Sequence, residues 1–426
     1  MPWLQVLRSQ QPEQRGAMAT ALRLLGNGSA WILPLKLLLS CLGLSITRRA
    51  MMTRRISFIL PLLALPTLLG CNGEQAPAGP PPPSLQSLDS ISNDPGAPRK
   101  QLARAIDGLF DNDNVGDTRA FVVRYGGRIV AERFASGYGK DTRFLGWSMS
   151  KCVTGIMIGL LVSDGRLRLN ESAPVPAWQR SGDPRGEITL KQLLQMRSGL
   201  RHTEAAEPIH GSDTTQMLFL AGRDDMAAQA EAQPLEAEPG RKFKYSSATT
   251  VILSDLAAHS LTSSDDPDRR RKLVSDYLRT RLLEPAGMST MIPEYDAAGT
   301  LIGSSMIHGT AHDWSKLGEF LRHKGSVRGA QVIPRRWIEF MRTPSPRNPG
   351  YGAHLWLNSP QSDGSEVLFT GKAPDDLFAC IGNLGQYVIG SPGQKLVVVR
   401  LGHTESAKRP ALRAALGNII ALYPSN

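Results

Sequence analysis

Cysteine is scarce in this 426-residue chain, and its four residues are too widely spaced for a cysteine-bound metal site: Cys41, Cys71, Cys152 and Cys380. No Cys-x-x-Cys pair occurs, and the eight histidines include no His-Glu-x-x-His motif, so we expect no zinc site. No Gly-x-Gly-x-x-Gly or Walker-type loop follows a strand-like run, which argues against a nucleotide. The sequence therefore predicts neither a metal nor a cofactor.

An excess of positive charge in the body of the chain, which would indicate nucleic acid, is also lacking. The formal net charge is +11, but residues 1–55 hold eight Lys or Arg residues and one Glu. That segment carries +7, which leaves +4 for residues 56–426. Because most of the basic charge lies in one terminal segment, we expect no nucleic-acid partner.

The N-terminal part of the chain has the pattern of an export signal. Within residues 51–70, two arginines precede an apolar run of about 14 residues, which is short for a membrane span. The run ends in Leu-Leu-Gly-Cys71, which resembles the cleavage box of bacterial lipoproteins, whose cysteine is lipidated. That resemblance implies a signal peptide over 51–70, a lipid anchor on Cys71, and a location in the cell envelope or periplasm on a bacterial membrane.

The segments on either side of this signal are predicted to lie outside the fold. Residues 1–50 contain another apolar stretch, either an additional anchor or, as we favour, a non-native extension upstream of the true start. Residues 71–98 include the run Pro80–Pro83 and are interpreted as a Pro-rich tether. Residues 99–426 contain no second linker of this kind, so we expect them to form one domain.

Strand patterns lie at both ends of that domain, with helical patterns between them. The expected elements are a helix over 100–110, a hairpin of 120–125 with 128–134, a hairpin of 385–389 with 395–401, and a helix over 410–422. This arrangement predicts an α+β fold. One antiparallel sheet is built from both chain ends and flanked by helices, with a mostly helical region inserted.

A Ser-x-x-Lys sequence, Ser148 to Lys151, opens one of the predicted helices. Apolar residues recur on one helical stripe from Val153 to Leu161, which places Ser148 in the first turn and Lys151 on the same face. A buried lysine can lose its charge and accept the proton of a serine nucleophile, and the helix N-terminus offers N–H groups to an oxyanion. An N-cap serine beside a solvated lysine would give the same short pattern.

The wider sequence resembles the serine β-lactamase and penicillin-binding protein superfamily. The segments that carry the resemblance occur in family order: 148–151, 188–200, 239–247, 283–288, 303–318 and 379–386. The chain is most similar to 6-aminohexanoate-dimer hydrolases and related carboxylesterases. This resemblance implies a β-lactamase/DD-peptidase-like fold.

The resemblance also implies roles for individual residues. Ser148, Lys151 and Tyr245 would be catalytic, and the backbone N–H groups of Ser148 and Asn383 would form the oxyanion hole. The candidates for the substrate pocket are Ser247, Gly382 and Gln386. The resemblance leaves open whether Lys151 or Tyr245 acts as the base.

Two departures from the family pattern bear on the substrate. The stretch 377–385 contains neither Lys-Thr-Gly nor His-Thr-Gly, and Tyr245 is followed by Ser-Ser where class C enzymes have Tyr-x-Asn. We therefore expect a serine hydrolase that cleaves a small carboxylic ester or linear amide through a Ser148 acyl-enzyme. The alternatives are a β-lactamase or D-Ala-D-Ala peptidase, and a non-catalytic envelope protein that uses the fold for binding.

Other notable residues are given ordinary structural roles. His308 and His312 are expected to be polar positions without a metal. Cys152 and Cys380 flank the predicted site and could approach each other, and we expect free buried thiols rather than a disulfide. The basic run 269–272 follows several aspartates and is expected to be a solvated face.

Overall fold

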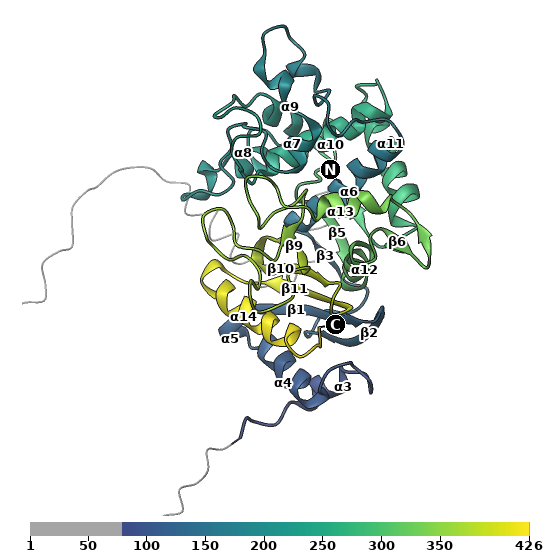
Figure 1. Ribbon diagram of the computed structural model, residues 1–426, viewed down its shortest axis with the longest axis vertical. Coiled ribbons are helices and arrows are strands. Elements are labelled where there is room, and N and C mark those ends of the chain that lie inside the picture. The colour runs from purple at the N-terminus through teal and green to yellow at the C-terminus, as the bar shows by residue number, and fades with distance from the viewer. Residues whose placement is uncertain (1–78, 426) are drawn as a thin grey trace, which may run out of the picture. The chain divides into compact units, whose positions relative to one another are not determined.

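A six-stranded antiparallel sheet forms the centre of the computed structural model, which describes residues 79–425 (Figure 1). Its strand order is β2-β1-β11-β10-β9-β8. The strands are β1 (Asp117–Tyr125), β2 (Arg128–Phe134), β8 (Trp356–Leu357), β9 (Phe378–Gly382), β10 (Gln386–Ser391) and β11 (Leu396–His403). Because β1 pairs with β11, the two ends of the domain meet in the middle of the sheet, as predicted.

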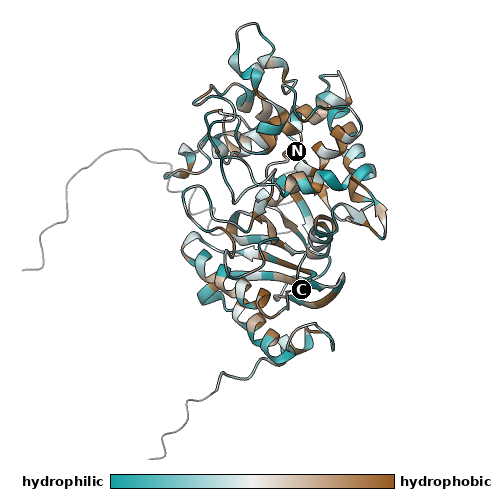
Figure 2. Ribbon diagram, in the orientation of Figure 1, coloured by the Kyte–Doolittle hydropathy of each residue, from teal (hydrophilic) through white to brown (hydrophobic). Residues whose placement is uncertain are grey.

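Helices cover both faces of this sheet, which is why its central strands are apolar on both sides. Successive side chains of a strand point to opposite faces. In β1, Ala120 and Val122 belong to the core beneath two helices, whereas Phe121 and Val123 belong to the core beneath two others. The first pair is α6 (Ser150–Ser163) and α12 (Ala311–Arg322), and the second is α4 (Arg99–Leu109) and α14 (Arg409–Ile420). In Figure 2 the strands between these layers are largely hydrophobic.

The inserted region between β2 and β9 is mostly helical and contains a second, small sheet. Its further helices are α7 (Leu190–Leu194), α8 (Asp213–Phe219), α9 (Met226–Glu231), α10 (Ser247–Leu261), α11 (Pro267–Leu278) and α13 (Arg335–Met341). The small sheet has the order β3-β5-β4, from Arg143–Leu145, Ile307–Thr310 and Ile292–Pro293. A short hairpin joins β6 (Ser326–Val327) and β7 (Ala330–Gln331). The predicted α+β architecture is thus confirmed.

The predicted tether is wrong in its second half. Leu85–Asp89 forms the helix α3, which begins with a cap from Ser84. Ser87 is buried and donates a hydrogen bond to Asp107, and Ile91, only 4% exposed, pairs with Ala131 of β2. The proline run favours an extended segment, but the backbone of residues 90–92 pairs with the edge of β2 and Ile91 is buried there, which folds the segment back onto the domain. The predictions for residues 1–78, including Cys71, fall outside the described residues.

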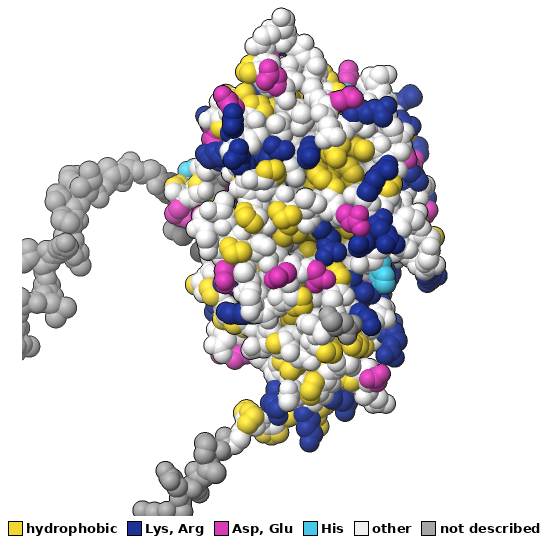
Figure 3. Space-filling model, viewed as in Figure 1, with side chains coloured by type: hydrophobic (Ala, Val, Ile, Leu, Met, Phe, Trp, Pro, Cys, Tyr) yellow, Lys and Arg dark blue, Asp and Glu magenta, His cyan; other side chains and the backbone are white. Residues whose placement is uncertain are grey.

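The surface of the described part carries charges of both signs. On the face shown in Figure 3, Lys and Arg side chains lie in several places, with acidic side chains between them. Between residues 79 and 425, no helix has the length and apolar character of a membrane span. Within the same residues, no group of three or more His, Cys, Asp or Glu side chains is arranged to hold a metal ion.

Candidate active site

Ser148 lies in a tight 3-10 turn, Trp147–Met149, directly before α6. Trp147 has a φ of 48°, a left-handed conformation that costs a residue other than glycine roughly 1–3 kcal/mol. This turn sets Ser148 just ahead of the helix rather than inside its first turn, and it leaves the side chain half-buried. Lys151 follows in the first turn of α6.

The three predicted catalytic side chains meet at this turn. Lys151 Nζ donates a hydrogen bond to Ser148 Oγ at 3.0 Å. The Tyr245 ring centroid lies 5.0 Å from Lys151 Nζ, and the Ser148 side chain is close enough to the Tyr245 hydroxyl to lower its pKa against the larger effect of burial. The fold therefore brings a nucleophile, an amine and a phenol from two distant segments within reach of one another.

Lys151 is buried, and its amine donates hydrogen bonds to three acceptors. Its side chain is 1% exposed, and Nζ also donates to Ser247 Oγ at 2.9 Å and to the backbone oxygen of Ser304 at 3.0 Å. Burial lowers the pKa of Lys151 to about 8, while the negative charge of Glu204 opposes that shift. An amine with this pKa is partly neutral near physiological pH and can accept a proton.

Tyr245 is held in an aromatic cluster. Its ring stacks on Trp356 at a centroid distance of 5.3 Å and meets Tyr351 edge-on at 5.8 Å. Burial, with the nearby charge of Glu204, raises the pKa of Tyr245 well above its usual range. The phenol therefore stays protonated at neutral pH and is suited to donate a proton rather than to accept one.

Glu204 is a site residue that the sequence analysis missed. Its carboxylate accepts two hydrogen bonds from Ser247, from the backbone N–H and from Oγ, each at 2.7 Å. It also contacts His202 Nε2 at 2.8 Å and accepts from Thr214 Oγ1 at 3.1 Å. Burial alone would raise the pKa of Glu204, but the His202 hydrogen bond and the Lys151 charge lower it to about 2. No motif marks this acid, because its role depends on contacts with distant segments.

Two of the predicted pocket residues have buried side chains that form hydrogen bonds only within the protein. Ser247 is 1% exposed and is held between Lys151 and Glu204. Gln386 is 3% exposed, and its amide donates to the backbone oxygen of Gly402 at 2.6 Å and accepts from the Gly402 N–H at 2.9 Å. Because buried polar groups must be satisfied internally, neither side chain offers surface to a substrate, contrary to the prediction.

Gly382, the third predicted pocket residue, marks a close approach of backbones. It ends β9, and an added Cβ there would overlap the carbonyl oxygen of Gly146. Gly146 directly precedes the turn that carries Ser148, so β9 passes against the nucleophile turn. Only a residue without a side chain permits this approach.

The strand register indicates a second candidate for the oxyanion hole, the backbone N–H of Ile381, in addition to that of Asn383. Asn383 begins the turn after β9, and its side chain accepts a hydrogen bond from Arg409. The backbone N–H of Asn358 donates to the oxygen of Leu377, so that peptide faces β8. The backbone N–H and C=O groups of every second residue in a strand face the same edge, so the N–H of Ile381 faces the β8 edge, like the carbonyl of Leu377. The pairing with β8 ends at Ala379, before Ile381.

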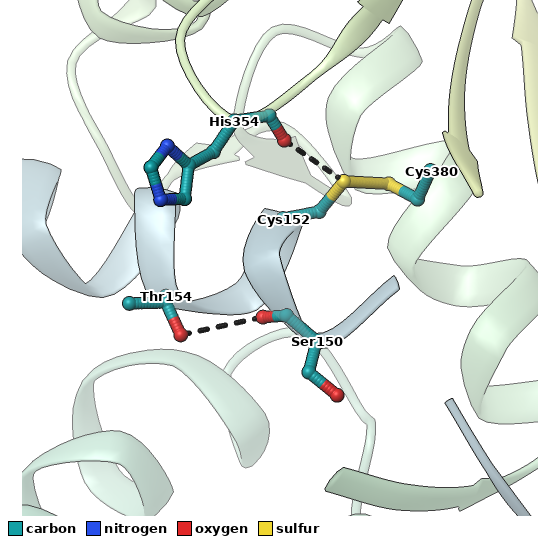
Figure 4. The surroundings of a disulfide bond; sticks show 5 residues. All are labelled: Ser150, Cys152, Thr154, His354 and Cys380. Atoms are coloured by element: carbon teal, nitrogen blue, oxygen red, sulfur yellow. Dashed lines mark hydrogen bonds between the residues drawn. A yellow bond between two sulfur atoms is a disulfide. The ribbon is translucent and has the colours of Figure 1, made fainter. Parts of the chain in front are cut away.

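Cys152 and Cys380 form a disulfide, so the expectation of free thiols is wrong. Cys152 lies in α6 and Cys380 in β9, with a Cα–Cα distance of 6.2 Å (Figure 4). The two positions are 228 residues apart in the chain. The sequence placed both near the site, but only the tertiary structure sets their separation.

The remaining predicted polar positions contact acidic side chains. His308 Nε2 lies 2.5 Å from a Glu294 carboxylate oxygen, and His312 Nε2 lies 2.7 Å from one of Glu132. Arg270 departs from the expected solvated face, because it is 5% exposed and forms a buried ion pair with Asp255. This buried side of α11 was not evident from its run of charges.

Comparison with known proteins agrees with this architecture. A family model described as Beta-lactamase matches residues 109–421. The chain is 24% identical to the 6-aminohexanoate-dimer hydrolase of Paenarthrobacter ureafaciens over 230 residues, which are 52% of this chain and only 56% of that relative.

Solved structures resemble the fold as well. A family VIII carboxylesterase has a TM-score of 0.55 and 15% identity, with 75% of this chain and 97% of that chain covered. A penicillin-binding protein homolog from Caulobacter crescentus has a TM-score of 0.53 and 17% identity, with 76% and 98% covered. With a family model that spans most of the sequence and these structural neighbours, the chain belongs to the beta-lactamase family.

Proposed function

We propose that this protein is a serine hydrolase that cleaves a carboxylic ester or a linear amide through an acyl-enzyme on Ser148. The observation that carries the proposal is the 3.0 Å hydrogen bond from the buried amine of Lys151 to Ser148 Oγ. The family model supports hydrolase chemistry in general. The choice of substrate rests on the sequence and on the site.

In the proposed mechanism, Ser148 Oγ attacks the substrate carbonyl while the neutral amine of Lys151 takes its proton. The two pKa shifts favour this assignment, because Lys151 has a pKa of about 8 while Tyr245 is held protonated. Tyr245 then passes its proton to the leaving group and recovers one from the protonated Lys151. In deacylation the neutral amine of Lys151 takes a proton from the attacking water and returns it to Ser148 Oγ as the acyl group leaves. The Ser148 N–H would bind the oxyanion, together with the N–H of Asn383 or Ile381.

Esters are the first candidate substrates, and linear amides the second. An alkoxide departs readily, whereas an amine must be protonated as it leaves. The relative from Paenarthrobacter ureafaciens is named for an aminohexanoate dimer, which favours an amide, but its match spans little more than half of its length. The missing Lys-Thr-Gly and Tyr-x-Asn sequences count against β-lactams.

The test is hydrolysis of p-nitrophenyl butyrate by the wild-type protein and by Ser148→Ala. We expect the variant to lose at least about a thousandfold in kcat/KM, because the nucleophile is removed. A fluorophosphonate probe should label the wild type only. Undiminished hydrolysis in Ser148→Ala would remove Ser148 from the role, and a folded wild type that neither turns over nor labels would favour a binding protein. Rapid nitrocefin turnover would favour a β-lactamase.

We further propose export and lipid anchoring on Cys71, which lies outside the described residues. The buried Cys152–Cys380 disulfide supports export, because disulfides persist mainly in oxidising compartments. The membrane would then be the only large partner, and the substrate a small molecule. Cys71→Ala should move the protein from the membrane fraction to the soluble fraction. Continued membrane retention of a processed Cys71→Ala protein would contradict the anchor.

A further inference from the structure

We propose that the Cys152–Cys380 disulfide is a positioning device of the active site, which fixes the nucleophile helix against the edge of β9 so that turnover depends on the bond. This inference rests on the proposed function, since it assumes that a carbonyl reacts between these two elements. It assigns to the two cysteines a role in the geometry of the reaction rather than in stability alone.

The two sulfurs join the elements that carry the opposite sides of the proposed site. Cys152 directly follows Lys151 on α6 and is four residues after Ser148. Cys380 directly precedes Ile381, whose N–H faces the free edge of β9. The close-up in Figure 4 shows the bond crossing from α6 to β9 beside His354, whose backbone oxygen lies 3.2 Å from Cys152 Sγ.

The strand needs such a support because only one of its edges is paired along its full length. β10 pairs with β9 as far as Gly382, but the β8 register ends at Ala379. From Cys380 onward, no strand of the described residues lies on the edge that faces the nucleophile turn. There Gly382 lies against Gly146, and the disulfide links the strand covalently to α6.

Small changes in this gap would affect the chemistry strongly. A displacement of about 1 Å between reacting groups can cost on the order of a hundredfold in rate. Two thiols at these positions would be held only by packing, at a van der Waals separation longer than a covalent bond. The turn and the strand edge could then move apart without unfolding the domain.

Both cysteines are buried, at 2% and 1% exposure, so reductants in solution have little access to the bond. Reduction by dithiothreitol would proceed by thiolate attack on one sulfur, which forms a mixed disulfide and releases the other cysteine as a thiol. The second thiol of the reagent then closes its ring and releases the first cysteine. The net change is one oxidised dithiothreitol and two cysteine thiols.

The first experiment compares full-length wild type with Cys152→Ser/Cys380→Ser and with the apolar replacement Cys152→Ala/Cys380→Val. With active sites counted by fluorophosphonate labelling, we expect kcat for p-nitrophenyl butyrate to fall about tenfold or more, with KM within about twofold. A role in stability alone would lower the number of active sites but leave kcat per site unchanged. A kcat within twofold of wild type in folded variants would overturn the proposal.

The second experiment uses the native protein and does not depend on the variants folding. Wild type is incubated with dithiothreitol, peptide mass mapping follows the thiols of Cys152 and Cys380, and near-UV circular dichroism follows the fold. We expect activity to fall as the thiols appear, before the fold is lost, and to return with oxidised glutathione, which is reduced to two glutathione thiols as the bond re-forms. Loss of activity only together with the fold, or full activity after complete reduction, would refute a positioning role.

The two hypotheses fail in different ways. If oxidised wild type neither hydrolyses the ester nor reacts with the probe, the proposed function fails. If oxidised wild type is active and the reduced form has the same kcat, only the role of the disulfide fails.

Discussion

At the scale of single residues, the central feature of the site is the buried amine of Lys151, whose pKa is lowered by burial and raised by the Glu204 carboxylate. Lys151 Nζ is faced by Ser148, Tyr245, Ser247 and the backbone oxygen of Ser304. Glu204, which is itself paired with His202, acts on Lys151 through Ser247. His354 is the other titratable neighbour, and burial lowers its pKa to about 3, so it is neutral. Glu204 is therefore the negative charge that holds a proton on Lys151.

Replacement of Glu204 should shift the acidic limb of the pH–rate profile. If Lys151 works in its neutral form, activity rises with pH through its pKa of about 8. Glu204 raises that pKa, so Glu204→Gln should move the limb of kcat/KM to lower pH. The matched control is Glu339→Gln, an exposed acid of α13 that pairs with Lys324. An unshifted limb in active Glu204→Gln would contradict electrostatic coupling.

At the scale of elements, the geometry of the candidate site depends on how closely three backbones approach one another. The 3-10 turn before α6, the end of β9 and the loop before α10 each contribute part of the site. The turn is strained at Trp147, and β9 touches it through Gly382. Helix α11 is fixed separately, by the buried pair of Arg270 and Asp255.

Gly382→Ala should damage both the fold and the rate. The new methyl group would overlap Gly146, and overpacking of this kind costs about 1–3 kcal/mol in the free energy of unfolding. The strand edge should also retreat from Ser148, which lowers kcat. Gly108→Ala is the control, since it lies in α4 with open space around it and should be stabilising by about 0.5–1 kcal/mol. Denaturant unfolding and ester kinetics measure both effects, and equal behaviour of the two variants would refute the close-approach argument.

Arg270→Ala should destabilise the helical region far more than Arg271→Ala. Arg270 and Asp255 are both buried, and removal of Arg270 leaves Asp255 with only His259 as a cationic neighbour, so the cost should approach that of a broken buried pair, about 3–5 kcal/mol. The exposed pair of Arg271 with Asp268 contributes about 0–1 kcal/mol. Urea unfolding of both variants provides the comparison, and losses of similar size would show that the buried pair has no special weight.

At the scale of the whole molecule, residues from both ends of the domain form one sheet, and the site lies where the inserted region meets it. The central pairing of β1 with β11 brings together residues separated by most of the domain. The Cys152–Cys380 bond also joins distant parts of the chain, with a sequence separation of 228 residues. Of the two, only the covalent bond persists in the unfolded chain, where it restricts the conformations that the chain can adopt.

Reduction of the disulfide should lower the global stability of the domain. The chain-entropy model gives roughly 5 kcal/mol for a loop of this length, and measured losses for native disulfides are about 2–5 kcal/mol. Urea unfolding with and without dithiothreitol measures the difference in midpoint. A midpoint that does not change on complete reduction would contradict this prediction, because it would show that release of the bond does not stabilise the unfolded chain.

The sequence by itself determined the features that depend on local pattern. Period-2 and helical spacing predicted both hairpins and the helices near each end, as β1–β2, β10–β11, α4 and α14 confirm. Ordered motifs predicted the family and indicated Ser148, Lys151 and Tyr245 as a group. These features follow from the chain because neighbouring residues along it fix backbone periodicity and motif spacing.

Only the tertiary structure decided which distant groups meet. Glu204 joins the site through its hydrogen bond with Ser247. Gln386 is buried and hydrogen-bonded to Gly402, and Cys152 forms a disulfide with Cys380. The segment around Ile91 pairs with the edge of β2 instead of extending as a tether. Each of these outcomes depends on separations of a few ångströms between segments far apart in sequence, and local pattern carries no information about such distances.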